Sequence, residues 1–180
     1  MVSTWPDPVE RVSSFLREAG AEARIEEFPE GTPTAADAAA AVGCELAQIV
    51  KSMVVMCDST AVLALVPGDR RCDPQKVARA VGAESARVAR GGEVEKATGF
   101  APGAVAPFAL SRVSTVLLDR TLLGHPIVWA GAGSPQHIVG IAPVELARLS
   151  RARPVDVVED RPYDFQTGGS AGVEANPKER

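Results

Sequence analysis

The stretch QIVKSMVVM, residues 48–56, decides the fold, because it predicts a buried strand with a lysine in its middle. Side chains alternate between the two faces of a strand, so Lys51 shares one face with Ile49 and Met53, and the opposite face is equally apolar. An unpaired ammonium in apolar surroundings costs several kcal/mol or loses its proton. Lys51 therefore either extends its charged end to a nearby rim or points into a pocket that needs a cation.

The segments around this stretch predict a mixed α/β domain. The run TAVLALVP (60–67) reads as the antiparallel partner of the lysine strand and ends in a Pro-Gly turn. Further strands are expected at 23–28, 114–119, 125–131 and 136–142. Apolar spacing and terminal glycines predict helices over 7–20, 32–43, 72–83, 91–99 and 142–150. Thr34 and Asp37 have capping-box spacing at the second of these helices, and Asp73 is the predicted cap of the third. Because strand pairs and helices are not regularly alternated, we expect a mixed, mostly antiparallel sheet rather than a doubly wound parallel one.

Composition is ordinary for a soluble domain, with 46% apolar and 23% charged residues among 180. We expect one domain over residues 1–158 and a polar, mobile tail over residues 159–180, which is rich in Gly, Pro and charge. The beginning of the chain does not resemble a secretory signal, and no run approaches roughly twenty apolar residues. These features predict a cytoplasmic protein.

Charge is divided unevenly along the chain. Residues 1–40 carry a net charge of −5, residues 41–154 carry +4 and residues 155–180 carry −3. A basic middle is compatible with a partner that bears phosphates, and a mixed, solvated surface explains the same numbers equally well.

The three cysteines form no C-x-x-C pair, which argues against a disulfide framework and against a thiolate zinc site. No nucleophile signature surrounds Cys57 or Cys72, so free, unreactive thiols are expected. The chain also lacks G-x-S-x-G, H-E-x-x-H and the phosphate-binding G-x-x-x-x-G-K-[ST] motif. Common nucleophile, metal and nucleotide mechanisms are therefore not indicated.

The run AGAGSPQH (130–137) is not a dinucleotide loop, because a third glycine is missing and the chain continues into a strand instead of a helix. We interpret it as a strand-loop-strand connection in which Gly131 and Gly133 let backbone N–H groups receive a carbonyl oxygen or oxyanion. A tight turn is the alternative. His137 could act as donor, base or shape filter, or be a satisfied residue at a strand end. His125 lies in a turn and receives no role.

Three segments, IVKSMVV, TGFAPGAVAP and VWAGAGSPQH, occur in an order and at distances that resemble the YbaK and prolyl-tRNA synthetase editing-domain family of aminoacyl-tRNA deacylases. The resemblance covers residues 30–150. The first segment supplies the family's strand lysine, the second its G-x-x-x-P element and the third the G-x-G-x-x-x-H element found in part of the family. The matching residues are Lys51, Gly103, Pro107, Gly131, Gly133 and His137.

The resemblance implies a barrel-like α/β domain that hydrolyses the ester between a wrong amino acid and the terminal adenosine of a tRNA, commonly tRNA(Pro). It implies catalytic roles for Lys51, which would orient the acceptor end, for Gly133, whose loop would bind the carbonyl, and for His137, which would close the pocket. The implied substrate-binding residues are Ser52, Gly103, Pro107, Gly131 and Ser134. No metal or organic cofactor is implied, and neither a membrane nor DNA is an expected partner.

Two departures affect the expected substrate. Alanine-specific freestanding members of the family typically carry Asn where this chain has Ser52, and Ala104 replaces the second glycine of a Gly-Gly-Val-x-Pro element. Both changes alter the pocket lining, so alanine, cysteine, serine and threonine all remain candidates.

A chain of this length has no room for a synthetase catalytic domain, so an editing protein of this kind would act in trans, with a synthetase as a second candidate partner. Its contacts with tRNA phosphates would come from the basic middle, and the candidates are Arg70, Arg71, Lys76 and Arg79. Two other readings stay open. The domain could bind an aminoacyl or nucleotide ligand, or dock on a synthetase, without turnover, and Lys51 could perform Schiff-base chemistry.

Overall fold

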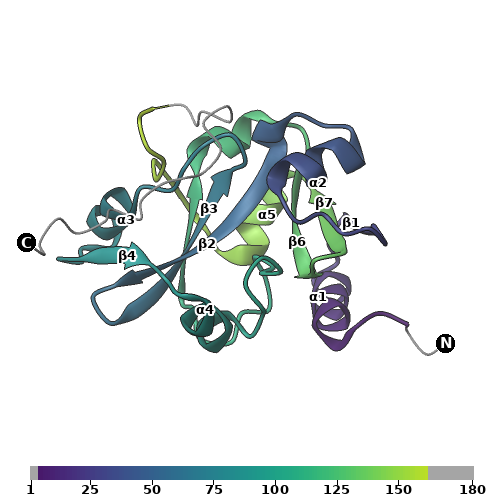
Figure 1. Ribbon diagram of the computed structural model, residues 1–180, viewed down its shortest axis with the longest axis horizontal. Coiled ribbons are helices and arrows are strands. Elements are labelled where there is room, and N and C mark those ends of the chain that lie inside the picture. Colours follow the sequence, from purple (N-terminus) through teal and green to yellow (C-terminus); the bar gives the residue numbers. More distant parts are fainter. Residues whose placement is uncertain (1–3, 162–180) are drawn as a thin grey trace, which may run out of the picture.

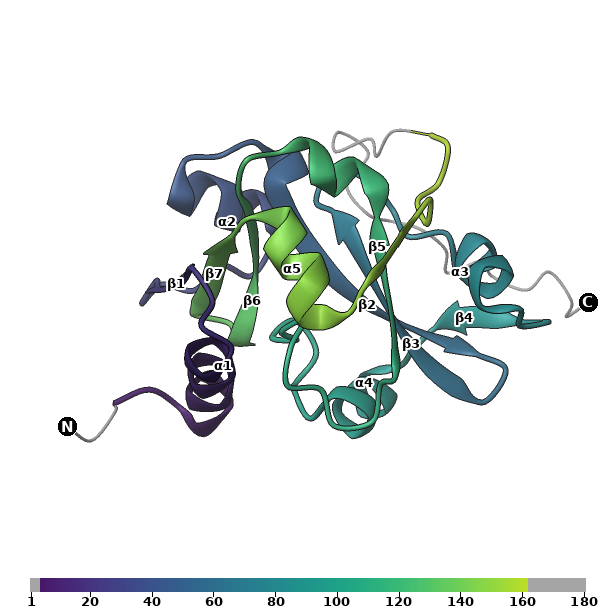
Figure 2. The same cartoon turned by 180° about the vertical axis from the view of Figure 1, so that it is seen from behind.

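The computed structural model describes residues 4–161 and shows a mixed sheet with helices on both faces (Figure 1, Figure 2). The strands are β1 (Ala23–Glu27), β2 (Ile49–Cys57), β3 (Thr60–Pro67), β4 (Ala86–Val88), β5 (Thr115–Asp119), β6 (Val128–Ser134), β7 (His137–Ile141) and β8 (Arg153–Val155). They pair in the order β1-β7-β6-β2-β3-β5-β8, and β4 pairs with the far end of β2. The helices are α1 (Asp7–Glu18), α2 (Ala35–Val42), α3 (Pro74–Val81), α4 (Gly91–Thr98) and α5 (Pro143–Ser150), with short 3-10 turns η1 (Leu46–Gln48) and η2 (Arg120–Gly124).

The sheet is open, so the predicted closure into a barrel-like core is wrong, whereas the mixed α/β class is confirmed. Strands β1 and β8 form the two ends of the strand order, and within residues 4–161 they do not pair with each other. They have only five and three residues, and Pro154 in β8 has no backbone N–H to donate to a further strand. Both strands are therefore typical edges.

The hairpin of β2 and β3 forms the centre of the fold and is buried on both faces. Its register runs from Val50 opposite Pro67 to Cys57 opposite Thr60. One face packs in a cluster with residues of α1, α4 and α5, and the other packs with Val77 of α3. Figures 1 and 2 show α3 and α5 on opposite sides of the sheet. The prediction of a strand that is apolar on both faces is confirmed.

The long predicted elements are confirmed, and the differences lie in short segments. Strands β4 and β8 and the turns η1 and η2 were not predicted. The run 130–137 is not a loop between strands, because β6 continues to Ser134 and only two residues separate it from β7. Of the predicted tail, residues 162–180 lie outside the described part. No helix among residues 4–161 has the length and apolar character needed to cross a membrane.

A testable consequence concerns Gly68, which follows the β2-β3 hairpin. Its N–H donates to the carbonyl of Ile49 at 2.8 Å, and a Cβ at this position would lie 2.5 Å from the carbonyl oxygen of Leu46. We expect Gly68→Ala to lower the free energy of unfolding by about 1 to 3 kcal/mol, because backbone must move to admit the methyl group. Urea denaturation measures the change. Gly124→Ala is the control, since nothing lies within 4 Å of its added Cβ; equal stabilities for the two variants would contradict the argument.

Candidate active site

A pocket of about 270 Å³ opens where the central strands stop pairing. Strands β2 and β6 run parallel and are in register only over Ile49 opposite Trp129 and Val50 opposite Ala130. Beyond these pairs, side chains of both strands line the pocket, together with the 103–105 segment and the β6-β7 hairpin. The polar and glycine residues in the lining are Thr32, Thr34, Lys51, Ser52, Gly103, Gly131, Ser134 and His137.

Lys51 lines this pocket, and its ammonium is held at the edge of the apolar core. The Nζ atom donates a hydrogen bond to the carbonyl oxygen of Arg70, in the loop that follows β3. Burial lowers the pKa of Lys51, and the nearby carboxylate of Asp69 opposes this effect. The strand therefore accommodates a lysine because the next loop supplies an acceptor and a counter-charge near the end of its side chain.

Cys72 lies in the same loop and does not supply a thiolate nucleophile. Burial raises the pKa of its thiol to about 12, with a further contribution from Asp73. The thiol is therefore protonated at neutral pH, as is Cys57, whose pKa burial also raises. Among the described residues no group of three or more His, Cys, Asp or Glu side chains could hold a metal ion.

Two buried polar atoms of the pocket residues have no hydrogen-bond partner within residues 4–161, namely Oγ of Ser52 and Nε2 of His137. Buried polar groups are nearly always satisfied, so two exceptions among the residues of one pocket require an explanation. A bound ligand that carries its own donors and acceptors would satisfy both.

His137 is 1% exposed, and its ring is fixed from three sides. Its Nδ1 lies 2.6 Å from Oγ of Ser134, and the ring of Trp5 packs edge-on at 5.5 Å. The carboxylate of Glu27 lies 4.0 Å from Nε2, which is too long for a hydrogen bond. The Ser134 hydroxyl also accepts the N–H of Gln136 at 3.1 Å. When that hydroxyl donates its proton to Nδ1, the ring proton stays on Nε2, which is then a hydrogen-bond donor.

The two glycines of the β6-β7 hairpin have different surroundings. Gly131 lines the pocket, and a Cβ there would lie 2.8 Å from the carbonyl oxygen of Val105, so glycine lets two backbone segments touch. Gly133 has φ +104 and is packed against the start of α1, where a Cβ would lie 2.8 Å from the Pro8 carbonyl. The registered β6-β7 pairs stop at Gly131 and resume at Ser134, so Gly133 lies in a bulge next to the pocket lining and not within it.

The second glycine segment is also divided. Gly103 lines the pocket with φ +81, whereas Pro107 is buried and lies outside the lining. The structure thus brings Lys51 and Ser52 together with residues of three other segments. The predicted pocket residues in the lining are Lys51, Ser52, Gly103, Gly131, Ser134 and His137, and those outside it are Pro107 and Gly133.

Sequence reasoning missed the part of the pocket formed by residues 32–38. Thr34 begins α2 in a capping box with Asp37, which the sequence predicted, and both Thr34 and Ala38 line the pocket. The capping pattern identifies a helix start but not its neighbour in space. Trp129 was likewise read only as a strand residue.

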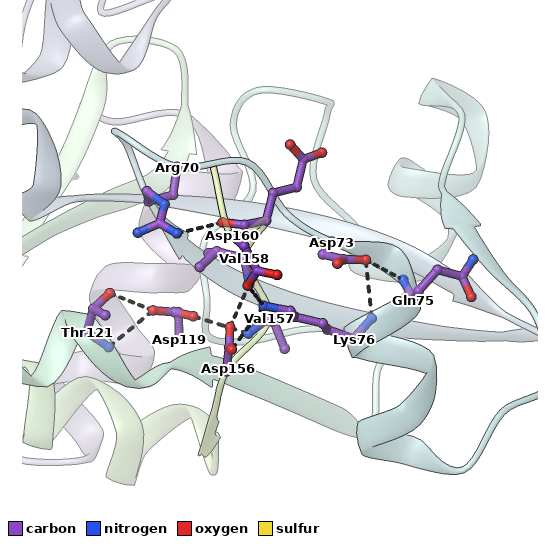
Figure 3. Close-up of polar contacts among 11 residues, drawn as sticks. Arg70, Asp73, Gln75, Lys76, Asp119, Thr121, Asp156, Val157, Val158 and Asp160 are labelled. Carbon is purple, nitrogen blue, oxygen red and sulfur yellow. Dashed lines mark hydrogen bonds and ion pairs between the residues drawn. The ribbon is translucent and has the colours of Figure 1, made fainter. Parts of the chain in front are cut away.

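Of the four candidate phosphate-binding residues, Arg70 and Arg71 precede α3 and Lys76 and Arg79 lie on it, and two of the four bind the segment that follows β8. Arg70 donates from Nη2 to the carbonyl oxygen of Glu159 at 2.5 Å, and Lys76 contacts Asp156 at 3.0 Å and Asp160 at 2.7 Å (Figure 3). The side chain of Arg71 is half-buried. Arg79 is exposed on α3 and offers an accessible guanidinium.

Comparison with known proteins supplies the family. Residues 29–149 match the aminoacyl-tRNA editing domain family. The uncharacterised protein YwhH of Bacillus subtilis is 30% identical over 138 residues, which cover 76% of this chain and 87% of YwhH. A proline–tRNA ligase of Xanthomonas oryzae is 33% identical over 143 residues, which cover 77% of this chain but only 25% of the ligase. The chain thus spans about a quarter of that ligase.

A solved structure gives the same assignment. A candidate trans-editing enzyme for prolyl-tRNA synthetase superimposes with a TM-score of 0.81 and 39% sequence identity, over 87% of this chain and 99% of that protein. The family match includes every predicted pocket residue, from Lys51 to His137. The chain belongs to the aminoacyl-tRNA editing domain family.

Proposed function

We propose that this protein is an aminoacyl-tRNA deacylase that acts in trans on mischarged tRNA, with tRNA(Pro) carrying a small wrong amino acid as the first candidate substrate. The observation that carries the proposal is that Lys51, Ser52 and His137 line one pocket in a member of the editing-domain family. The likeness to a candidate trans-editing enzyme for prolyl-tRNA synthetase supports both the action in trans and the choice of tRNA.

The size of the pocket supports a small acyl group. Sites for drug-sized ligands have volumes of about 300 to 1,000 Å³, and this pocket has about 270 Å³. Such a volume suits an aminoacyl group and part of a ribose better than a whole nucleotide. Alanine, cysteine, serine and threonine esters all meet this condition.

The proposed reaction is attack of a water molecule on the ester carbonyl carbon. A new carbon–oxygen bond forms, the bond to the ribose oxygen breaks, and one water proton ends on that leaving oxygen. An activated ester needs mainly a positioned water and stabilisation of the oxyanion. In this scheme Lys51 orients the acceptor end, and backbone amides of the bulge at Gly131 and Gly133 receive the oxyanion. His137 closes the amino-acid pocket, and a substrate hydroxyl or a backbone carbonyl activates the water.

The first test is release of labelled amino acid from tRNA(Pro) charged with alanine, cysteine, serine or threonine. We expect turnover of at least one ester, and we expect Lys51→Ala to lower kcat/KM by about 100-fold or more, because the group that orients the acceptor end against the pocket is removed. Lys96→Ala, which alters an exposed lysine on α4, is the matched control and should match the wild type. Full activity of Lys51→Ala at subsaturating substrate would exclude the proposed role. If the wild type binds tRNA but cleaves none of the esters, the protein is a binding module.

A second test separates two roles for His137. Because its Nε2 is buried without a hydrogen-bond partner in the described chain, we expect it to bond to a polar group on the amino acid. His137→Ala should then lower kcat/KM for the serine, threonine and cysteine esters, whose side chains carry a hydroxyl or a thiol, about tenfold more than for the alanine ester. This difference is the equivalent of one hydrogen bond. An equal loss on all esters that the wild type cleaves would indicate a role in the chemical step instead.

A third test concerns the tRNA surface. Arg79 is exposed on α3, so we expect it to contact a phosphate. In a plot of log affinity against log salt concentration, Arg79→Ala should reduce the steepness by about 1 and weaken binding to different tRNAs alike. Arg17→Ala is the control, because α1 and α3 lie at opposite ends of the molecule in both ribbon views. A slope that Arg79→Ala leaves unchanged would remove α3 from the interface.

A further inference from the structure

The chain beyond β8 is bound along the loop that holds Lys51. We refer to residues 69–73 as the lysine loop and to residues 156–160 as the C-terminal segment. The N–H of Glu159 donates to the carbonyl of Arg71 at 2.9 Å, and the N–H of Asp73 donates to the carbonyl of Val157 at 2.8 Å. Cys72 and Val158 form an antiparallel bridge between these bonds. The C-terminal segment therefore adds a short stretch of sheet pairing to the lysine loop.

Side chains strengthen this pairing on both sides. The Arg70 guanidinium binds the carbonyl oxygen of Glu159, and the Lys76 ammonium binds Asp156 and Asp160 (Figure 3). The hydrogen bonds that Lys76 donates to Asp160 and, with a smaller effect, to Asp156 raise the pKa of Lys76. Because the carboxylates are exposed, each ion pair contributes modestly to stability. Their effect is to keep the two segments in register.

The other side of the C-terminal segment is anchored in the core. Val157 and Val158 are 0% and 4% exposed and belong to the cluster under β2 and β3. The N–H of Val157 donates to Oδ2 of the buried Asp119 at 3.2 Å, and Oδ1 of the same carboxylate accepts the N–H and hydroxyl of Thr121 (Figure 3). A segment that is fixed to β5 can in turn fix whatever pairs with it.

The lysine loop connects this anchor to the pocket, because the carbonyl of Arg70 accepts the hydrogen bond from the Lys51 ammonium. The residues on either side of that carbonyl are the ones that the C-terminal segment binds. The family match ends at residue 149, so this support is contributed by residues beyond it. We propose that residues 156–160 position the Lys51 ammonium by fixing the lysine loop. The inference rests on the proposed function of Lys51 and makes the segment a positioning element, not a catalytic one.

The test removes one backbone hydrogen bond and keeps the rest of the chain. Glu159→Pro deletes the N–H that bonds to Arg71, and the extended backbone at Val158 is compatible with a following proline. Glu159→Ala is the matched control, because it alters the same exposed side chain but keeps the N–H. We expect Glu159→Pro to lower kcat for the best ester about tenfold with KM changed less than about twofold, and Glu159→Ala to match the wild type.

A second readout does not depend on activity. The sequence contains four lysines, Lys51, Lys76, Lys96 and Lys178, so an NMR titration of protein with ¹³C-labelled lysine ε-carbons gives few signals, and Lys51→Arg identifies that of Lys51. Burial lowers the pKa of Lys51. Within the lysine loop, Asp69 and Cys72 raise this pKa and Arg71 lowers it. A looser loop admits water, so the pKa of Lys51 should rise toward its ordinary value in Glu159→Pro and stay unchanged in Glu159→Ala.

The outcomes separate this inference from the proposed function. If Glu159→Pro shifts the pKa of Lys51 and the wild-type protein cleaves none of the esters, the positioning role is supported and the deacylase is rejected. A folded Glu159→Pro protein with an unchanged titration and unchanged kcat would overturn the positioning role alone. If Glu159→Pro does not fold, the double variant Asp156→Asn with Asp160→Asn removes the charge pairing to Lys76 instead. This double variant should lower kcat and raise the pKa of Lys51 by smaller amounts than Glu159→Pro. If neither kcat nor the pKa changes, the inference is overturned.

Discussion

The placement of an ammonium in a strand that is buried on both faces is the constraint on which this structure depends. Lys51 meets it because the backbone carbonyl of Arg70 reaches the end of its side chain and Asp69 lies near it. A side-chain acceptor could rotate away, but a backbone carbonyl moves only with its loop. The stability of that loop therefore decides where the charge is held, and the close turn at Gly68 and the residues after β8 both contribute to it.

The pocket itself follows from the mixed topology of the sheet. The parallel pair of β2 and β6 is only two residues long, while each strand continues in an antiparallel hairpin with its other neighbour. Beyond the parallel pair the two hairpins do not fill the space between them. Loop 103–105 approaches Gly131 of β6 so closely that a side chain would not fit there. The pocket is consequently bounded by regular structure and by backbone contacts, which are more rigid than a wall of surface loops.

Most of the fold could be predicted because its signals are local. The two-faced apolar strand, the capping box at Thr34 and the cap at Asp73 are all present in the structure. Strand β8 was missed because three residues show no periodicity. The open sheet was missed because whether two edge strands pair with each other depends on segments far apart in the sequence. In the site, strand alternation left Lys51 either at a rim or in a pocket, and the structure shows that it lines the pocket. The packing of Gly133 against the start of α1 could not be predicted, because glycine is required both where a ligand approaches and where two backbone segments pack closely.

Three groups that are costly to bury lie together at the pocket. Lys51, Oγ of Ser52 and Nε2 of His137 each lie at the same pocket, and each is costly in an apolar interior. A domain selected only for stability would replace them with apolar residues of similar volume.

Binding and catalysis would both account for their presence, but they make different demands on the geometry. A binder gains from donors that fit the planar ester, whereas a hydrolase gains only from donors that fit the oxyanion better than the ester carbonyl. In the proposed deacylase the bulge beside the pocket would supply such donors, because its ladder is interrupted and its backbone is packed against the start of α1.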